Sequence, residues 1–527
     1  MKKTPVFHPF AFAAYPALFL FSHNIGSLSF NEITSPLAVS LILSIGLWIV
    51  MYVFIRDYHK SGFIVTLFLL LFFSYGHFSK YLTTIYLLWP AVFVMGILVA
   101  FKVKNPFKNV TLVFNIIAVV MIAFPLYSIA AFKFSNRTVK APYDYSQDFA
   151  REGGVDAHGK ALPNIYYIIL DAYAGTSILS ELYNFDNSEY INKLRQKGFI
   201  IQDRSFSNYS KTFLTVASSF NMDYIHSFLG KQLPSNVYEK KQFWGLIRNN
   251  KAFRFLKKRG YSVIAFSSGH IDTELKNADV YLSPGLNFSE FQNMVINTTP
   301  IPPFLKLFNL DDQFDLQRKR INSIFDKLSK LKKSKEPFIV FAHIMAPHPP
   351  FVFGAHGEPH NPEEIFTDHD GDWLIRKGRL SRSRYIKGYT DQLTYINSRM
   401  LEAVDKIISQ SATPPIIIIT GDHGPRSMCI WSNPYKTYMR ECMSVTKAYY
   451  LPDCEECLHY EELSLVNIFR VLFNHYFGTH YDLLKDENYY QFETKKGFAF
   501  MKLSDSILQP NQELIRYHKE RDLANAR

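Results

Sequence analysis

The pattern of apolar positions divides this chain of 527 residues into two parts. Residues 1–135 are dominated by long runs of Leu, Ile, Val, Phe and Ala, whereas the remainder alternates short apolar runs with amphipathic stretches. A helix of about 20 residues spans the hydrocarbon core of a bilayer. We therefore expect about five membrane-spanning helices, with four as the alternative because the first and third runs are short, at residues 6–22, 36–55, 63–77, 82–101 and 110–132.

Positive charges in the short loops predict how these helices are oriented. Loops rich in Lys and Arg stay in the cytoplasm. One set of alternate loops holds most of these charges: Lys2, Lys3, Arg56, Lys60, Lys102, Lys104 and Lys108. With an odd number of spans, the rest of the chain lies outside the cytoplasm, and we predict a multi-pass membrane protein.

The second part has the pattern of an α/β protein, in which a mostly parallel sheet is sandwiched by helices. Several of its expected strands are apolar throughout, as buried parallel strands are. Helices are expected at 321–332 and 389–408, and strands at 165–170, 262–267, 338–342, 416–420 and 447–451. The polar, Gly-containing stretch 136–160 is the predicted linker, so the predicted domains are 1–135 and 161–527.

Net charge and cysteine content narrow the class of protein. The formal net charge of +12 fits a protein in an anionic bilayer, and without a recognition motif we expect no nucleic-acid partner. The four cysteines cluster late in the chain, which favours two disulfides in an oxidising compartment. A four-cysteine zinc site is the alternative, but the first spacing is longer than paired zinc ligands normally show. The cysteines are Cys429, Cys442, Cys454 and Cys457.

Two of the apolar strands run directly into residues that can bind metal. In PNIYYIILDAYAG the strand ends at Asp171, which is either a ligand for a divalent cation or a helix N-cap. In PPIIIITGDHGPR the strand delivers Asp422 and His423 together, followed by Gly424. Adjacent oxygen and nitrogen ligands suit zinc or manganese, whereas an ordinary loop is the alternative.

A third strand and a polar loop add candidates for acid–base chemistry and for a nucleophile. PFIVFAHIMAPHPPF places His343 at a strand end and His348 in a proline-stiffened loop, although either histidine can be a hydrogen-bonding core residue. SNYSKTFLTVASSFN leads into a helix, where positive potential favours a hydroxyl nucleophile. We choose Thr212 over Ser210 and Thr215; the alternative is that these hydroxyls only cap the helix.

These motifs follow an order that is known from one enzyme superfamily. LDAY, then TFLTVASS, then a Pro-His loop, then GDHG resembles the sulfatase-like branch of the alkaline-phosphatase superfamily. With apolar spans in front, the layout looks like that of the phosphoethanolamine transferases and the lipoteichoic acid synthases. The resemblance implies a helical membrane bundle followed by an α/β alkaline-phosphatase-like domain.

Carried over to these positions, the resemblance implies that one divalent cation, zinc or manganese, is surrounded by Asp171, Thr212, Asp422 and His423; a second ion stays open. His348 would bind substrate or donate a proton, and His343 is a further candidate for substrate binding. The first acidic ligand in the two transferase families is usually Glu, whereas it is Asp171 here. Those families also usually have a further histidine after GDHG, but PRSMCIW follows here. Arg426 is a candidate for holding a phosphate oxygen there, or else a surface residue.

The resemblance predicts a transferase that moves a phospho-head group from a membrane phospholipid to an envelope glycan or lipid through a phospho-threonine. A phosphodiesterase, phosphatase or sulfatase-type hydrolase of the same fold is the alternative, but the C/S-x-P-x-R motif of the usual sulfatases is missing around Thr212. A non-catalytic membrane-anchored binding protein is the alternative of another class. All four implied metal residues are present, which favours an enzyme.

Overall fold

The computed structural model divides into two compact units, Met1–Ala141 with Leu286–Asp312, and Pro142–Gly285 with Gln313–Arg527. The predicted linker 136–160 lies outside the residues that the structure describes. The described residues are 4–25, 30–79, 84–103, 107–135, 161–229, 240–283, 290–307, 313–331, 336–360, 366–367, 369–454, 457, 463–494 and 497–525.

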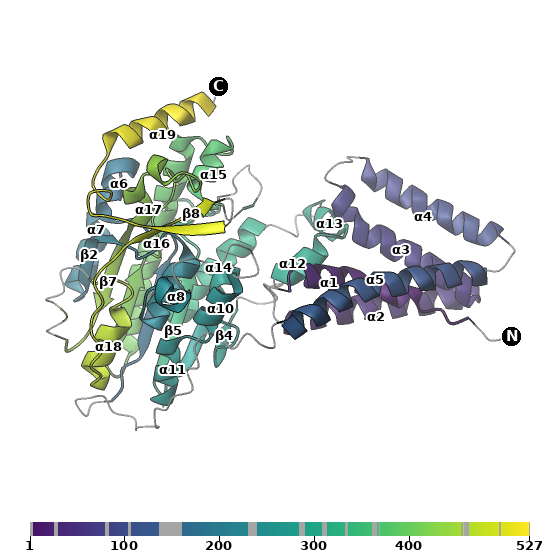
Figure 1. Ribbon diagram of the computed structural model, residues 1–527, viewed down its shortest axis with the longest axis horizontal. Helices are drawn as coiled ribbons and strands as arrows, with labels where there is room; N and C mark the ends of the chain where they lie inside the picture. The colour runs from purple at the N-terminus through teal and green to yellow at the C-terminus, as the bar shows by residue number, and fades with distance from the viewer. Residues whose placement is uncertain are drawn as a thin grey trace. The chain divides into compact units, whose positions relative to one another are not determined.

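The first unit is helical (Figure 1), and each of the five apolar runs falls on one of its helices. Within the described residues, four helices are long and apolar enough to cross a membrane, and α1 is shorter, with 16 residues. The carboxylate of Asp57 caps the start of α3 by accepting from the backbone N–H groups of His59 and Lys60. The helices are α1 (His8–His23), α2 (Phe30–Ile55), α3 (Tyr58–Phe78), α4 (Ile85–Lys102) and α5 (Phe107–Ser135).

Two short helices from later in the sequence, α12 (Glu290–Ile296) and α13 (Ile301–Leu307), also belong to this unit. The ring of Phe291 packs edge-on against Phe21 of α1, with 5.9 Å between centroids. The backbone N–H of Gly76 in α3 donates to the carbonyl of Thr298 at 2.9 Å. The sequence pattern places 161–527 in one domain and does not signal this return.

The second unit is built on a seven-stranded sheet in the described part of the chain, in the order β2-β7-β6-β1-β5-β3-β4. β1 pairs in parallel with β5 and β6, and β3 pairs in parallel with β4 and β5, whereas β7 is antiparallel to β2 and β6. The mostly parallel α/β prediction is confirmed. The strands are β1 (Ile165–Leu170), β2 (Ile200–Phe206), β3 (Ser262–Phe266), β4 (Val280–Leu282), β5 (Phe338–Ile344), β6 (Ile416–Thr420) and β7 (Ser444–Tyr450).

Both faces of this sheet are buried, and the central strand shows why. Successive side chains of a strand point to opposite faces. In β1, Tyr166 and Ile168 join one hydrophobic core, while Tyr167 and Ile169 join the other. The first core is packed by α6 (Thr176–Tyr183), α7 (Ser188–Gln196), α14 (Gln313–Leu328), α15 (Gly371–Arg376) and α16 (Arg382–Gln410); the second by α8 (Thr212–Asn221), α10 (Lys240–Arg248), α11 (Lys251–Lys258) and α18 (Ile468–Phe477). Figure 1 shows helices on both sides of the strands.

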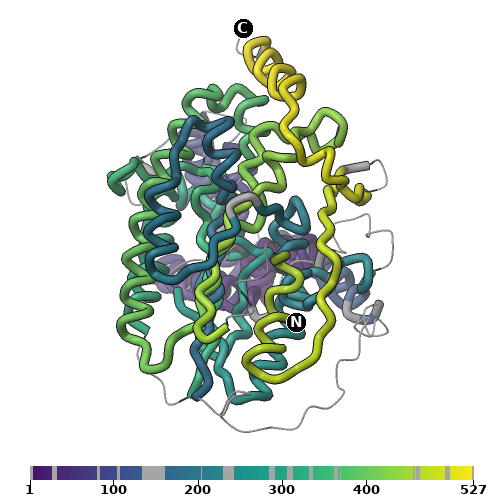
Figure 2. The backbone as a smooth tube through the Cα atoms, turned by 90° about the vertical axis from the view of Figure 1, so that its left-hand side faces the viewer, coloured from purple at the N-terminus to yellow at the C-terminus, as the bar shows by residue number. Residues whose placement is uncertain are grey.

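The predicted long helix at 389–408 is α16, and it begins earlier, where the Ser381 hydroxyl accepts from the backbone N–H of Arg384. The C-terminal helix α19, yellow at the top of Figures 1 and 2, is joined to α16 by an ion pair between Arg382 and Asp522 at 2.6 Å. The remaining elements are α9 (Ile225–Leu229), α17 (Met439–Met443), α19 (Gln512–Asn525), and the hairpin of β8 (Tyr489–Thr494) and β9 (Gly497–Lys502).

The cysteines form one disulfide rather than the two that their even number suggested. Cys454 and Cys457 are bonded. Cys429 and Cys442 are buried free thiols that contact each other without a bond, and burial raises the pKa of the Cys442 thiol well above its usual value. The four-cysteine zinc alternative does not fit this division into a bonded and an unbonded pair.

Candidate active site

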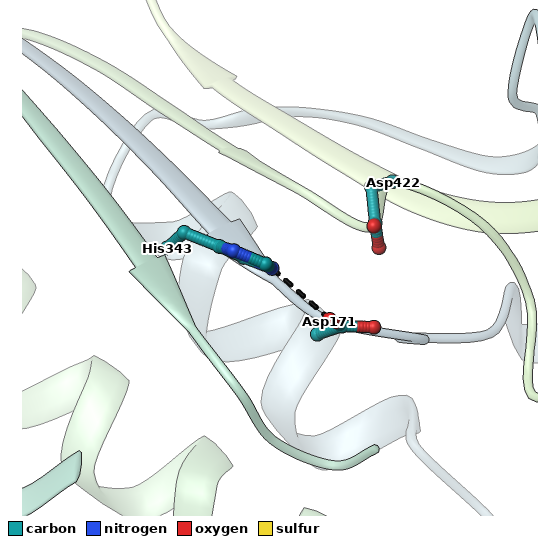
Figure 3. Close-up of side chains that lie close together, drawn as sticks. All are labelled: Asp171, His343 and Asp422. Carbon is teal, nitrogen blue, oxygen red and sulfur yellow. Dashed lines mark hydrogen bonds and ion pairs between the residues drawn. The ribbon is translucent and has the colours of Figure 1, made fainter. Parts of the chain in front are cut away.

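The sheet brings three of the predicted side chains to one edge. β1 lies between β5 and β6 and is parallel to both, so their carboxyl ends meet. Asp171 follows β1, His343 lies near the end of β5, and Asp422 stands two residues after the end of β6. Figure 3 shows the three side chains converging from these separate segments. The helix-cap alternative for Asp171 is wrong, because the next helix, α6, has Gly175 as its N-cap residue.

The ring of His423 lies at the centre of the predicted ligand set. Its Nε2 atom is 3.2 Å from Oγ1 of Thr212. The same atom is 3.4 Å from Oδ1 of Asp171 and 3.3 Å from Oδ2 of Asp422. The structure therefore collects all four residues that the resemblance assigns to the cation.

Hydrogen bonds to the backbone orient the side chains of His423 and Asp422. Nδ1 of His423 lies 2.8 Å from the carbonyl of Gly424, so the ring donates there and keeps the Nε2 lone pair. Burial, followed by the charge of Arg426, lowers the pKa of His423 to about 4, which keeps the ring neutral. Oδ1 of Asp422 accepts from the backbone N–H groups of Ala172 and His423.

The remaining carboxylate oxygens point to an ion. Oδ1 of Asp171 and Oδ2 of Asp422 are buried and have no hydrogen-bond partner among the described residues. Buried polar atoms are normally paired, and a buried charge needs a partner or a metal. Two carboxylates, a neutral imidazole and a hydroxyl suit a divalent cation such as zinc or manganese. The residues present therefore fit the implied metal.

His343 is buried behind Asp171, and both of its ring nitrogens are engaged. Nε2 lies 3.1 Å from Oδ2 of Asp171, and Nδ1 lies 2.7 Å from the hydroxyl of Thr273. One ligand atom each of Asp171, His343 and Asp422 lies within 4.8 Å of the other two, a group that can itself hold a metal ion. His343 therefore lies next to the proposed metal ligands Asp171 and Asp422, and its side chain is fully buried.

Among the three candidate hydroxyls, Thr212 is the one in contact with this cluster. Its Oγ1 faces His423, whereas Thr215 donates to the carbonyls of Tyr209 and Asp422. The Ser210 hydroxyl accepts from the backbone N–H of Gln491. Thr212 is the first residue of α8, and no side chain caps that helix. The structure does not support the capping alternative, and the helix N-terminus adds positive potential beside the hydroxyl.

A cluster of charged side chains lies next to the proposed metal ligands, and Asp370 is at its centre. Oδ1 of Asp370 is 2.6 Å from the Arg426 guanidinium and 3.6 Å from Nε2 of His348. The alternative of a surface Arg426 is wrong, because this side chain is buried. Burial would raise the pKa of Asp370, but Arg426 and Lys211 hold it well below its usual range.

The charge state of His348 depends on two carboxylates, those of Asp171 and Asp370. Burial alone would lower its pKa, but Asp171 and then Asp370 raise that pKa to about 9. Burial alone would raise the pKa of Asp171, but His348 and the hydrogen bond from His343 hold it well below its usual range. The His348 ring lies 6.2 Å from that of His423, centroid to centroid. The negative charges of Asp171 and Asp370 therefore favour the protonated form of this imidazole beside the metal cluster.

Sequence reasoning missed Asp370, Lys211 and Trp431. The Lys211 ammonium lies 3.3 Å from the centre of the Trp431 ring and 4.0 Å from Oδ2 of Asp370. The Trp431 indole N–H donates to the same carboxylate oxygen at 3.1 Å. Lys211 directly precedes the nucleophile candidate, which was an available signal. Asp370 and Trp431 lie in polar loops whose sequence does not distinguish them.

The fold and this site define an enzyme domain of the alkaline-phosphatase type. Residues 163–469, more than half of the chain, match the Sulfatase family model, and the chain belongs to the sulfatase family. The resemblance drawn from the motifs is confirmed at this level. A comparison with curated proteins finds no match.

A comparison with solved structures finds similar chains of low sequence identity. The C-terminal periplasmic domain of EcEptC from Escherichia coli, in a complex with Zn, is 9% identical, with a TM-score of 0.41 over 66% of this chain and 94% of that one. The integral membrane lipooligosaccharide phosphoethanolamine transferase EptA from Neisseria meningitidis is 12% identical, with a TM-score of 0.36 over 88% and 94%. The lipoteichoic acid synthase LtaP from Listeria monocytogenes is 13% identical, with a TM-score of 0.36 over 68% and 92%.

Proposed function

We propose that this protein is a membrane-anchored, metal-dependent phosphotransferase that moves a phospho-head group from a membrane phospholipid to an envelope glycan or lipid. The observation that carries the proposal is the contact of 3.2 Å between the Thr212 hydroxyl and His423, beside two buried carboxylate oxygens that have no hydrogen-bond partner in the described part of the chain. A head group of the phosphoethanolamine or phosphoglycerol type is proposed, because a donor of this type resides in the bilayer.

Thr212 is proposed as the nucleophile. Its oxygen forms a bond to phosphorus while the bond from phosphorus to the departing diacylglycerol oxygen breaks, and the head group stays on the threonine. The diacylglycerol oxygen gains a proton, and the threonine hydroxyl loses one. In the second half, an acceptor hydroxyl forms the new bond to phosphorus and Thr212 departs with a proton. Acceptor identity then separates a transferase from a hydrolase, for which the acceptor is water.

Asp171, Thr212, Asp422 and His423 would hold the divalent cation. Bound there, zinc or manganese would act as a Lewis acid and stabilise negative charge on the phosphoryl group and on the nucleophile. The chain itself fixes the ligands: His343 orients Asp171, and two backbone N–H groups orient Asp422. We propose that His343 positions Asp171, because both of its ring nitrogens are engaged within the protein.

His348 is proposed as the proton donor to the leaving alcohol, since the charges of Asp171 and Asp370 raise its pKa. A cation held by Asp171 would compete with this effect, which makes the Asp370 contact at 3.6 Å the more important one. Arg426 is proposed to bind a phosphoryl oxygen, because its buried guanidinium lies in the same cluster and its Nε atom has no hydrogen-bond partner among the described residues.

The helices of the first unit support a location in the bacterial inner membrane, with the second unit outside the cytoplasm. Four of them are long and apolar enough to cross a membrane. The positive loop charges favour the predicted orientation. The Cys454–Cys457 disulfide is in keeping with an oxidising compartment. A lipid donor would then share a membrane with the enzyme.

The test is to trap the head group on the protein. Purified full-length protein would be incubated with vesicles containing isotope-labelled phosphatidylethanolamine or phosphatidylglycerol, and peptide mass spectrometry would locate the label. We expect it on Thr212. Thr212→Ala should carry no label and lose on the order of 10³-fold or more in head-group release.

Thr215→Val is the matched control, because that hydroxyl contacts the backbone of Asp422 but does not face His423. It should keep the label on Thr212. Label on another hydroxyl would refute the nucleophile assignment. Rapid release of head group with water as the sole acceptor would replace the transferase by a phosphodiesterase, and absence of both label and release would leave the binding-protein alternative.

A further inference from the structure

The membrane unit contains an apolar groove of about 680 Å³ that the proposed chemistry does not use. Its walls come from two membrane helices and from α13, the short helix that returns from later in the sequence. Aromatic rings and prolines make up most of the lining, which consists of Phe68, Leu71, Phe72, Tyr75, Tyr86, Trp89, Pro90, Phe93, Pro300, Pro303 and Phe304.

The groove lies at the end of the helices that is predicted to face outwards. It is formed by the last turns of α3 and the first turns of α4. The positive residues Arg56, Lys60 and Lys102 mark the opposite ends of these helices, which the charge rule places in the cytoplasm. Trp and Tyr favour the membrane–water interface, and Tyr75, Tyr86 and Trp89 all line the groove. The groove therefore opens at the level of the outer leaflet.

The segment 297–298 is held tightly against α3. This contact positions the following helix, α13, which forms the third wall of the groove. The carbonyl of Thr298 accepts from the N–H of Gly76 at 2.9 Å. A Cβ atom on Gly76 would lie 1.9 Å from the carbonyl oxygen of Asn297, so the approach requires a glycine. The Trp89 indole N–H donates to the carbonyl of Leu71 at 2.8 Å, which fixes the ring in the groove wall.

We propose that this groove binds one acyl chain of an outer-leaflet phospholipid. The lining on α3 runs from Phe68 to Tyr75, which lie seven positions and about 10 Å apart along the helix. A transmembrane helix of a second copy would need a seam of about 30 Å, so a slender hydrocarbon chain fits better. α3 and α4 are themselves candidate membrane spans, which makes lipid hydrocarbon the solvent around the groove.

α13 gives a second reason for a lipid occupant. Its apolar side chains Ile301 and Phe304 are 37% and 59% exposed in the structure. Exposed apolar residues on a short helix at the end of a membrane bundle indicate insertion at the bilayer surface. The groove is thus bounded by hydrocarbon-facing protein on three sides and by the bilayer on the fourth.

Lipid binding in this groove does not rest on the proposed function. Under that function, the groove would hold a donor or a product lipid. The test is photo-cross-linking of the full-length protein in vesicles of phosphatidylethanolamine and phosphatidylglycerol. The probe is a phosphatidylethanolamine with a diazirine in the middle of one acyl chain, and peptide mass spectrometry locates the adducts. The same labelling is run on Thr212→Ala, which separates occupancy from turnover.

We expect adducts on the groove walls of both proteins. Leu71→Trp, which fills the groove, should lower this labelling about tenfold, as for a loss of about 1.4 kcal/mol in binding. Leu70→Trp is the matched control, because Leu70 is the neighbouring leucine, is exposed and does not line the groove. Labelling spread evenly over the outer faces of the helices, or equal labelling of the two variants, would overturn the proposal.

Discussion

The Nε2 atom of His423 lies 3.2 Å from Oγ1 of Thr212, although 211 positions separate the two residues. Two local features produce this contact. The buried strand β6 ends at Thr420 and delivers His423 three residues later, and α8 begins at Thr212 without a capping side chain. A shift of either segment would separate the nucleophile from the proposed metal ligands.

Metal removal should both inactivate and destabilise the protein, because a chelator leaves the buried carboxylates of Asp171 and Asp422 uncompensated. A ligand at 100 times its Kd stabilises the folded state by about 2.7 kcal/mol. We expect the melting temperature to fall in chelator and to recover as zinc or manganese is titrated back. Thermal unfolding of the purified protein in detergent measures this.

Asp422→Asn should abolish the response of the melting temperature to metal. Asp279→Asn is the control, since Asp279 pairs with Lys257 at 2.7 Å, away from the ligand set. A protein whose activity and melting temperature ignore both chelator and added metal would have no functional cation at this site.

Asp370 should control the pH dependence of the reaction through His348. Asp370 raises the pKa of His348, which lies at about 9 in the structure, so removing its charge lowers that pKa. A step that needs protonated His348 is lost as pH rises through this pKa. For Asp370→Asn, we therefore expect the alkaline limb of the kcat/KM profile to move to lower pH.

Asp372→Asn provides the matched control for that profile. Asp372 lies two positions further on but pairs with Arg376 and Arg521, at 3.3 Å and 2.8 Å. Its substitution should leave the alkaline limb in place. If Asp370→Asn lowers the rate equally at every pH, Asp370 acts only by holding Arg426 or Lys211 in position.

The sequence predicts those parts of the fold whose local pattern agrees with their final surroundings. β1 and β6 lie at their predicted positions because central parallel strands are continuous apolar runs. β2 was missed because IIQDRSF carries charged residues, as edge strands do. α12 and α13 are too short to be recognised as membrane helices from the sequence, and only tertiary packing assigns them to the membrane unit.

The same distinction applies to the site. Asp171, Asp422 and His423 follow buried strands, so topology alone brings them to one edge of the sheet. Asp370 could not be predicted in this way, because Asp372 stands two positions away in the same polar stretch of sequence, where α15 begins. The pairing of Asp370 with Arg426 at 2.6 Å distinguishes them, and this pairing exists only in the folded chain.

The turn after GDHG should tolerate no side chain at Gly424. A Cβ atom there would lie 1.8 Å from the backbone carbonyl oxygen of Glu441, so the loop carrying His423 would have to move. We expect Gly424→Ala to cost about 2 kcal/mol or more in the free energy of unfolding and to weaken metal binding. Gly245→Ala is the control, since Gly245 is exposed within α10 with nothing within 4 Å. It should stabilise the protein by about 0.5–1 kcal/mol. Equal effects of both substitutions on thermal unfolding would contradict the close contact.

Gly76 should be as sensitive to an added side chain as Gly424, but its substitution should affect the membrane unit. In Gly76→Ala the added Cβ would meet the Asn297 carbonyl oxygen at 1.9 Å, and the hydrogen bond to Thr298 would lengthen. Displacement of α13 removes one wall of the groove, so we expect weaker acyl-chain labelling and a lower melting temperature in detergent. Gly46→Ala in α2, where a Cβ atom would meet no described atom within 4 Å, should leave the labelling unchanged and should not lower the melting temperature. Because Gly76 lies outside the groove lining, lost labelling in this variant can arise only through the position of 297–304. Retained labelling would mean that α3 and α4 hold the lipid without the returning segment.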